Sequence, residues 1–179
     1  MPGQDLDGRL LAYQLSRGGD EESLLRVMDV ATGEDVDGPI DRCRYTGVAW
    51  LPGSKAFYYT RRLPPEAVPD GEQQYHRRVY LHQVGSPAGE DVMIFGDGLE
   101  KTNYYSVSVS RDGRWLIIGA AAGTAPRNDL WIADLTATSA SAPSGSFRSH
   151  RPMPSAPVAA TSSMSCHTVL CGSEVALTA

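Results

Sequence analysis

The chain has 179 residues, a formal net charge of −5 and three cysteines, and 21% of its residues are charged. This length suffices for one ordinary domain with a sizeable core. The acidic balance argues against a nucleic-acid binder or a basic membrane-surface protein, and no apolar run approaches the roughly 20 residues of a membrane span. The N-terminal residues MPGQDLDGR lack the basic start and apolar core of a signal peptide. Three scattered cysteines are too few for a disulfide framework, so we expect a cytoplasmic protein with reduced thiols.

A two-part unit recurs within the first 135 residues. The first part is a tight turn that leads into an apolar strand, and its copies are DGRLLAY from Asp7, PGSKAFYY from Pro52 and DGRWLII from Asp112. The second part alternates apolar residues ahead of Asp or Gln, and its copies are LRVMDV from Leu25, VYLHQV from Val79 and LWIADL from Leu130. The two parts are equally spaced in the first and third copies. In the middle copy they are separated by RRLPPEAVPDGEQQYH, whose prolines and charges predict an exposed inserted loop.

Both parts of the unit are predicted to be strands. Asp-Gly supplies the positive φ of a hairpin turn, and aromatic and β-branched residues follow directly. The stretch DEESLLRVMDV also permits a helix, with Asp20 as N-cap and Leu24 stacked on Met28. We favour a strand there, because Val27 and Val30 are poor helix formers and the matching NDLWIADL has no helical signal.

Further strands surround the unit. GVAWLP and SVSVSRD precede the turn in the second and third copies, and EDVMIFG follows the middle copy. Four antiparallel strands per repeat predict an all-β fold, a partial β-propeller of about two and a half to three blades. A generic β-sandwich or meander is the alternative. The first blade lacks a clear innermost strand and the third ends after Leu135, so the chain is expected to be a fragment, cut at both ends.

Residues 136–179 differ sharply from the rest, because they are rich in Ser, Ala, Thr and Pro and contain one acidic residue, Glu174. Such a segment buries too little apolar surface to offset its ordering entropy, so we expect a disordered tail. Its composition is also what out-of-frame reading of GC-rich DNA would yield. A one-base shift near codon 136 is therefore one hypothesis, and an authentic disordered tail is the other.

No catalytic constellation is evident. A nucleophile elbow requires G-x-S-x-G, and GSPAG at Gly85 has its serine in the wrong place. His76 is expected in the polar loop and His82 on a strand, neither with an identifiable acidic partner, and His150 and His167 fall in the tail. We expect no catalytic residue.

Cofactor and ligand motifs are equally weak. CHTVLC, from Cys166 to Cys171, offers at most three of the four ligands that structural zinc needs. GDGLEK at Gly96 lacks the third glycine of a dinucleotide fingerprint and is interpreted as a hairpin turn. RRLPPEAVP could bind a partner as polyproline, although an inserted loop is favoured. The doublets at Arg61 and Arg77 are interpreted as a solvated face. No metal or cofactor is expected.

Several blocks, taken together, resemble a known family. DGRLLAYQLSRGGDEESLLRVMDVATGEDV, VAWLPGSKAFYYTRR, RRVYLHQVGSPAGEDVMIFG and VSRDGRWLIIGAAAGTAPRNDLWIADL are similar, in order and spacing, to the N-terminal propeller of the prolyl oligopeptidase family of serine peptidases. The resemblance covers roughly residues 5–135. One departure is small, since the family's Asp-Gly turn is Gly53-Ser54 here.

The resemblance implies a seven-bladed propeller that covers an α/β-hydrolase domain, with a central tunnel that admits short peptides and a Ser-Asp-His triad that cleaves typically after proline. The hydrolase domain follows the propeller, so no position of this chain matches a catalytic residue, and the chain alone is expected to be inactive. Its expected partners are short peptides and the missing hydrolase domain. A free-standing propeller-type interaction module is the alternative function.

Overall fold

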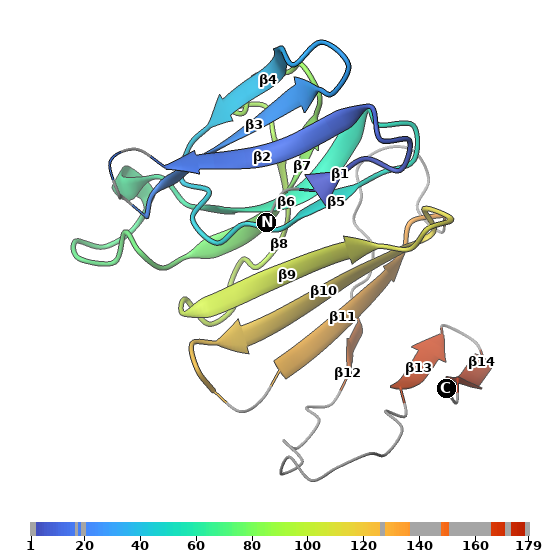
Figure 1. Cartoon of the computed structure of the whole chain (residues 1–179). Helices are drawn as coiled ribbons and strands as arrows, with labels where there is room; N and C mark the ends of the chain where they lie inside the picture. Colours follow the sequence, from blue (N-terminus) through green and yellow to red (C-terminus); the bar gives the residue numbers. More distant parts are fainter. Residues whose placement is uncertain are drawn as a thin grey trace, which may run out of the picture.

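The computed structural model of the chain describes residues 3–16, 18, 21–125, 128–136, 148–150, 166–170 and 173–177. The strands in these ranges form three four-stranded antiparallel sheets and one two-stranded hairpin. Figure 1 shows the three larger sheets following one another in chain order. The predicted all-β fold is thereby confirmed. Within the same ranges, no helix is long and apolar enough to cross a membrane.

The first sheet has the order β1-β2-β3-β4. Its strands are β1 (Gly3–Gln4), β2 (Leu10–Ser16), β3 (Ser23–Asp29) and β4 (Asp35–Ile40). The stretch with helical potential forms strand β3, as predicted. The expectation of a missing innermost strand was wrong, because Gly3 pairs with Ala12 of β2. Strand β1 has only two residues, which is too short for an alternating pattern to be recognised.

The second sheet repeats the first. Its strands are β5 (Val48–Trp50), β6 (Ala56–Arg62), β7 (Arg77–Gln83) and β8 (Val92–Phe95). Residues 63–76 connect β6 to β7, with a single 3₁₀ turn, η1 (Pro65–Ala67). The insertion predicted from the prolines is therefore confirmed.

The third sheet contains β9 (Asn103–Val109), β10 (Trp115–Ala122), β11 (Asn128–Asp134) and β12 (Arg148–His150). The prediction that this blade ends after Leu135 was wrong, because Arg148 of β12 pairs with Ile132 of β11. β13 (Cys166–Leu170) and β14 (Ser173–Leu177) form the hairpin. These three strands lie in the segment predicted to be disordered. Its other residues, apart from Thr136, lie outside the described residues.

GDGLEK was interpreted as a hairpin turn, but it has a different role. It leads from β8, the outer strand of the second sheet, to β9, the inner strand of the third (Figure 1). Gly96 has a φ of +106°, and a Cβ atom there would lie 3.0 Å from the Arg78 side chain. An outer-to-inner connection between successive four-stranded sheets is the connectivity of propeller blades.

The second sheet is buried on both faces. In β6, Phe57 and Tyr59 belong to the core shared with the first sheet, while Tyr58 belongs to the core shared with the third. This explains why AFYY is continuously apolar rather than alternating, since a strand packed on both sides has no solvent face. The first core also includes Ala12, Leu25, Val27, Ile40, Cys43 and Trp50. The second includes Leu116, Ile118 and Ala120 of β10.

The turns of neighbouring sheets also pack closely. A Cβ atom on Gly113, which has a φ of +73°, would lie 2.3 Å from a ring carbon of Pro52. Gly98 has a φ of +70° but has no atom within 4 Å of its Cβ position. The two glycines therefore share a backbone conformation and differ in packing.

We predict that Gly113→Ala destabilises the chain by about 1–3 kcal/mol more than Gly98→Ala, because only the first adds a clash to the shared left-handed strain. Urea unfolding followed by tryptophan fluorescence measures both. Equal losses would show that the turns of the second and third sheets do not touch in solution.

Candidate functional site

A buried histidine joins the first two sheets. His82 lies on β7 and its side chain is fully buried. Its Nε2 lies 2.8 Å from Oδ2 of Asp37 on β4, and its Nδ1 lies 2.6 Å from Oδ1 of Asp91, the residue before β8. The Asp37 and Asp91 side chains are only 6% and 1% exposed. One imidazole thus contacts two buried carboxylates, one from each sheet.

Additional donors satisfy the same carboxylates. The Tyr59 hydroxyl donates to Oδ2 of Asp91 over 2.5 Å, and the backbone N–H of Gly85 donates to Oδ2 of Asp37 over 2.6 Å. We call His82, Asp37, Asp91 and Tyr59 the His82 network. Phe57 covers the imidazole, with ring centroids 5.0 Å apart. The network is therefore a satisfied polar group inside an aromatic core.

The electrostatics favour a protonated histidine. Burial by itself lowers the pKa of His82, but the hydrogen bonds and charges of Asp37 and Asp91 outweigh burial and raise the pKa from 6.5 to about 9. Burial raises the pKa of Asp37, yet its hydrogen bonds to His82 and Gly85 bring the pKa below its usual value. Near neutral pH His82 is therefore a cation, and Asp37 beside it is an anion.

The His82 network does not have the arrangement of a catalytic base. A general base needs a free nitrogen within reach of the proton that it removes. Both ring nitrogens of His82 already contact carboxylates, and the side chain has no exposed surface. The network instead connects the first and second sheets.

The sequence had shown no acidic partner for either histidine, and this was wrong for both. His82 contacts Asp37 and Asp91, and His76 Nε2 lies 2.6 Å from Glu72 in the 63–76 loop. Asp37 is distant in sequence and reaches His82 only through stacking of the sheets. Asp91 was detectable, because the block RRVYLHQVGSPAGEDVMIFG matches, from Tyr80 to Asp91, the pattern Y-x-H-x-x-G-x-x-x-x-x-D that is usual in the family it resembles.

We predict that His82→Asn costs about 3–5 kcal/mol of unfolding free energy, because two buried carboxylates lose their counter-charge. His76→Asn is the matched control and should cost less than about 1 kcal/mol, since it lies in a partly exposed loop pair. Urea titration measures both. Similar losses of unfolding free energy in the two variants would contradict the assignment of His82 as the residue that connects the first two sheets.

The free energy of unfolding should also depend on pH. Because the folded pKa of His82 is about 9 against 6.5, its contribution is complete below pH 6.5 and disappears as the pH rises through 9, by on the order of 3 kcal/mol. Asp37, whose pKa is lowered, contributes in the opposite direction and only on acidification. Urea midpoints from pH 6 to 10 test this. The control variant His76→Asn should show the same decrease at alkaline pH. A urea midpoint of the unchanged chain that stays constant from pH 6 to 10 would contradict the prediction.

The arginine doublets do not form a solvated face, contrary to the sequence interpretation. Arg62, Arg77 and Arg78 are 7%, 2% and 5% exposed. Arg62 pairs with Arg77 across β6 and β7, and Arg61 with Arg78. Strand pairing places the doublets side by side, and Arg77 stacks on Tyr104 of the third sheet. The order of charges along the sequence could not indicate that these arginines are buried, because their burial results from the pairing of β6 with β7 across a long loop.

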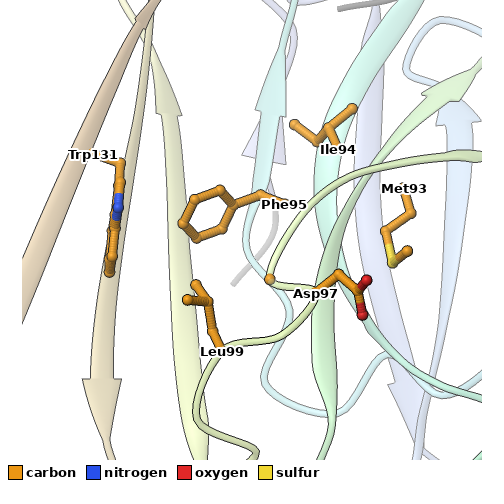
Figure 2. A pocket seen from close by; sticks show the side chains of 7 residues that line it. Met93, Ile94, Phe95, Asp97, Leu99 and Trp131 are labelled. Atoms are coloured by element: carbon orange, nitrogen blue, oxygen red, sulfur yellow. The ribbon is translucent and has the colours of Figure 1, made fainter. Parts of the chain in front are cut away.

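A shallow hollow lies between the second and third sheets. Figure 2 shows Phe95 and Trp131 on facing sides of it, with Leu99 nearby. The Phe95 ring packs edge-to-face on Trp131, with centroids 5.0 Å apart, and on Tyr105 at 5.7 Å. Its lining is apolar apart from Asp97. The hollow marks the junction of two sheets and offers no acid–base pair.

The other motifs fall in places without described chemistry. GSPAG is the turn between β7 and β8. Cys166 and His167 lie on β13 and His150 on β12, but their side chains, like Cys171 as a whole, lie outside the described residues. The described residues include no group of three His, Cys, Asp or Glu side chains suited to hold a metal ion.

Comparison with known proteins places the fold in a family. The model of the prolyl oligopeptidase N-terminal β-propeller domain matches residues 5–151. The match extends beyond residue 135, where the resemblance was expected to end, and it includes β12. The division of the chain at residue 135 stays a prediction.

Individual relatives agree. A prolyl endopeptidase of Elizabethkingia miricola is 32% identical over 130 residues, which cover 72% of this chain and 18% of the relative. Prolyl oligopeptidase A of Galerina marginata is 28% identical over 143 residues, covering 70% and 19%. The chain thus spans about a fifth of the length of these relatives.

Solved structures show the same fold. A prolyl endopeptidase structure has a TM-score of 0.67 at 26% identity, over 96% of this chain and 22% of its own. Prolyl oligopeptidase B of Galerina marginata, bound to a 35mer substrate, has a TM-score of 0.69 at 19% identity, over 96% and 24%. With three stacked four-stranded sheets and a family match over most of its length, the chain belongs to the prolyl oligopeptidase family and represents part of its N-terminal β-propeller domain.

Proposed function

We propose that this chain is the substrate-gating propeller portion of a cytoplasmic serine peptidase that hydrolyses short peptides, typically after proline. The observation that carries this proposal is the family match over residues 5–151, which coincides with the three stacked sheets. The relatives that share this segment are named as prolyl endopeptidases and oligopeptidases.

The proposed role is selection rather than chemistry. A ring of blades leaves a narrow axial channel, so that a flexible peptide can enter where a folded protein cannot. Hydrolysis would proceed by acyl transfer to a serine held in a separate α/β-hydrolase domain. Among the described residues the only buried histidine has both nitrogens occupied, which supports a non-catalytic role for this segment.

The stacking of the sheets supports a gating role. The His82 network and the two cores fix three successive sheets relative to one another. A gate that excludes by size must keep its blades in register, because separation of two blades would open a lateral entrance. Blades tied by a buried ion pair meet this requirement.

A chimera tests this proposal, in which residues 5–151 of this chain replace the matching segment of the Elizabethkingia miricola enzyme. We predict that the chimera hydrolyses a blocked Gly-Pro chromogenic substrate and leaves a folded proline-containing protein intact. The 179-residue chain alone should release no chromophore. The same chimera with its nucleophilic serine changed to alanine is the control.

Two outcomes would contradict the proposal. One is turnover by the isolated chain. The other is a well-folded chimera that cleaves the folded protein as readily as the dipeptide, since the exchanged segment would then not restrict access. A chimera that folds but has no activity on either substrate would favour the interaction-module alternative.

A further inference from the structure

Arginine and tyrosine side chains from three connections meet at one end of the second and third sheets. Arg44 and Tyr45 lie between β4 and β5, Arg62 ends β6, Arg77 begins β7, and Tyr104 is the second residue of β9. We call these five residues the arginine–tyrosine cluster. The Arg77 guanidinium lies 4.0 Å from the centroid of the Tyr104 ring and 6.0 Å from that of Tyr45. The Arg44 guanidinium lies 4.9 Å from the centroid of the Tyr45 ring.

The charges in this cluster do not balance. Arg44 pairs with Glu21, and Arg62 pairs with Glu22. Arg77 makes no ion pair with any carboxylate in the described part of the chain, although it is 2% exposed. Its Nε and Nη1 atoms are buried without a hydrogen-bond partner. Arg77 therefore provides buried donors and a positive charge that nothing described here neutralises.

The surroundings strengthen this imbalance. Burial lowers the pKa of Arg77, and the positive charges of Arg62 and Arg44 lower it further, while Tyr104 opposes them. Leaving buried donors unsatisfied costs about 1–3 kcal/mol for a neutral group and more for a charged one. Buried polar groups of this kind call for a specific explanation.

The cluster is reachable from solvent through its tyrosines. Tyr45 is 56% exposed and Tyr104 is 39% exposed. Their rings pack edge-to-face with centroids 5.8 Å apart. Tyr45 has a φ of +60°, a left-handed conformation that costs a bulky residue free energy and is frequent at functional sites. Access to the Arg77 guanidinium requires displacement of the Tyr45 side chain, whose hydroxyl accepts a 3.2 Å hydrogen bond from Arg44.

A purely structural role accounts for part of these contacts. A cation stacked on an aromatic ring contributes about 0.5–2 kcal/mol, which explains Tyr104 over Arg77. Stacking does not explain why Arg77 has no acidic partner among the described residues, or why the Tyr45 and Tyr104 rings are exposed to solvent. Arginine and tyrosine are also the residues enriched at binding hot spots.

We propose that the arginine–tyrosine cluster binds a carboxylate of a peptide ligand. The carboxylate enters between Tyr45 and Tyr104 and accepts two hydrogen bonds from the Arg77 guanidinium, whose planar fork matches its two oxygens. The ligand class is a peptide with an acidic side chain or a free C-terminus. This inference rests on the proposed function for the view that the ligand is a peptide.

The test is a titration of the 15N-labelled 179-residue chain with three short peptides. Acetyl-Gly-Glu-Gly-amide carries a side-chain carboxylate, acetyl-Gly-Gln-Gly-amide carries none, and acetyl-Gly-Gln-Gly with a free C-terminus carries a terminal one. At least one carboxylate peptide should bind about tenfold more tightly than the neutral peptide, equivalent to about 1.4 kcal/mol. It should shift the amide signals of Tyr45, Arg77 and Tyr104. The carboxylate peptide that binds more tightly shows whether the cluster prefers a side-chain carboxylate or a C-terminal one.

Variants assign the effect to Arg77. Arg77→Gln should abolish the preference for carboxylate. Arg77→Lys keeps the charge and should weaken the preference several-fold, because one ammonium cannot make two parallel bonds. Arg114→Gln is the matched control, since Arg114 is an exposed arginine paired with Asp134 in the third sheet, and the preference should remain.

Equal binding of all three peptides would overturn the inference, and so would a preference that survives in Arg77→Gln. If Arg77→Gln does not fold, the decision passes to Arg77→Lys and to salt, which should reduce the preference of the unchanged chain. The readout is binding to this chain, so it is separate from peptidase activity. An active, size-selective chimera with no carboxylate preference here would refute this inference and leave the proposed function intact.

Discussion

The second sheet is covered on both faces along its strands β5, β6 and β7, while its outer strand β8 is partly exposed, and the rest of the structure depends on this constraint. Each of its faces is covered by a neighbouring sheet, so Phe57 and Tyr58, adjacent on one strand, belong to two different cores. A four-stranded sheet of this size cannot bury apolar residues on both faces alone. It is stable only as the middle layer of a stack, and the inner strands and turns of its neighbours are positioned by that stacking.

The two junctions of the stack use different physical means. Between the second and third sheets Phe95 packs on Trp131 and Tyr105, and the buried Thr60 hydroxyl donates to the Tyr105 carbonyl oxygen over 3.3 Å. Between the first and second sheets the aromatic core surrounds the His82 network. Apolar packing tolerates sliding of one sheet over another better than a set of short, directional hydrogen bonds does. The His82 network therefore fixes the register of the first and second sheets, whereas aromatic packing around Phe95 contributes buried area between the second and third.

Much of this architecture was predictable from the sequence, and what was missed has physical causes. The repeated turn-strand unit identified β2, β6 and β10 because each strand is long and follows a turn residue. Strands β1 and β12 were missed because two or three residues hold no periodicity. The family pattern already contained His82 and Asp91, but Asp37 could not be assigned, because it joins them only when β4 lies over the second sheet. The burial of Arg62 and Arg77 was likewise unpredictable, since a polar, proline-rich loop separates them.

Two of the buried cationic side chains in the described part of the chain, His82 and Arg77, differ in what surrounds them, and this difference distinguishes structure from function. At His82 one positive charge faces two carboxylates, and Tyr59 and Gly85 supply further donors to the same oxygens. At Arg77 one positive charge faces two tyrosine rings and two further arginines, whose own acids are already engaged. Both sites lie where water is excluded, so the desolvation cost of a charge is similar. The first site recovers this cost within the fold. The second recovers only part of it, through stacking on the two tyrosine rings, and this makes Arg77, rather than the histidine, the side chain suited to contact an anionic ligand.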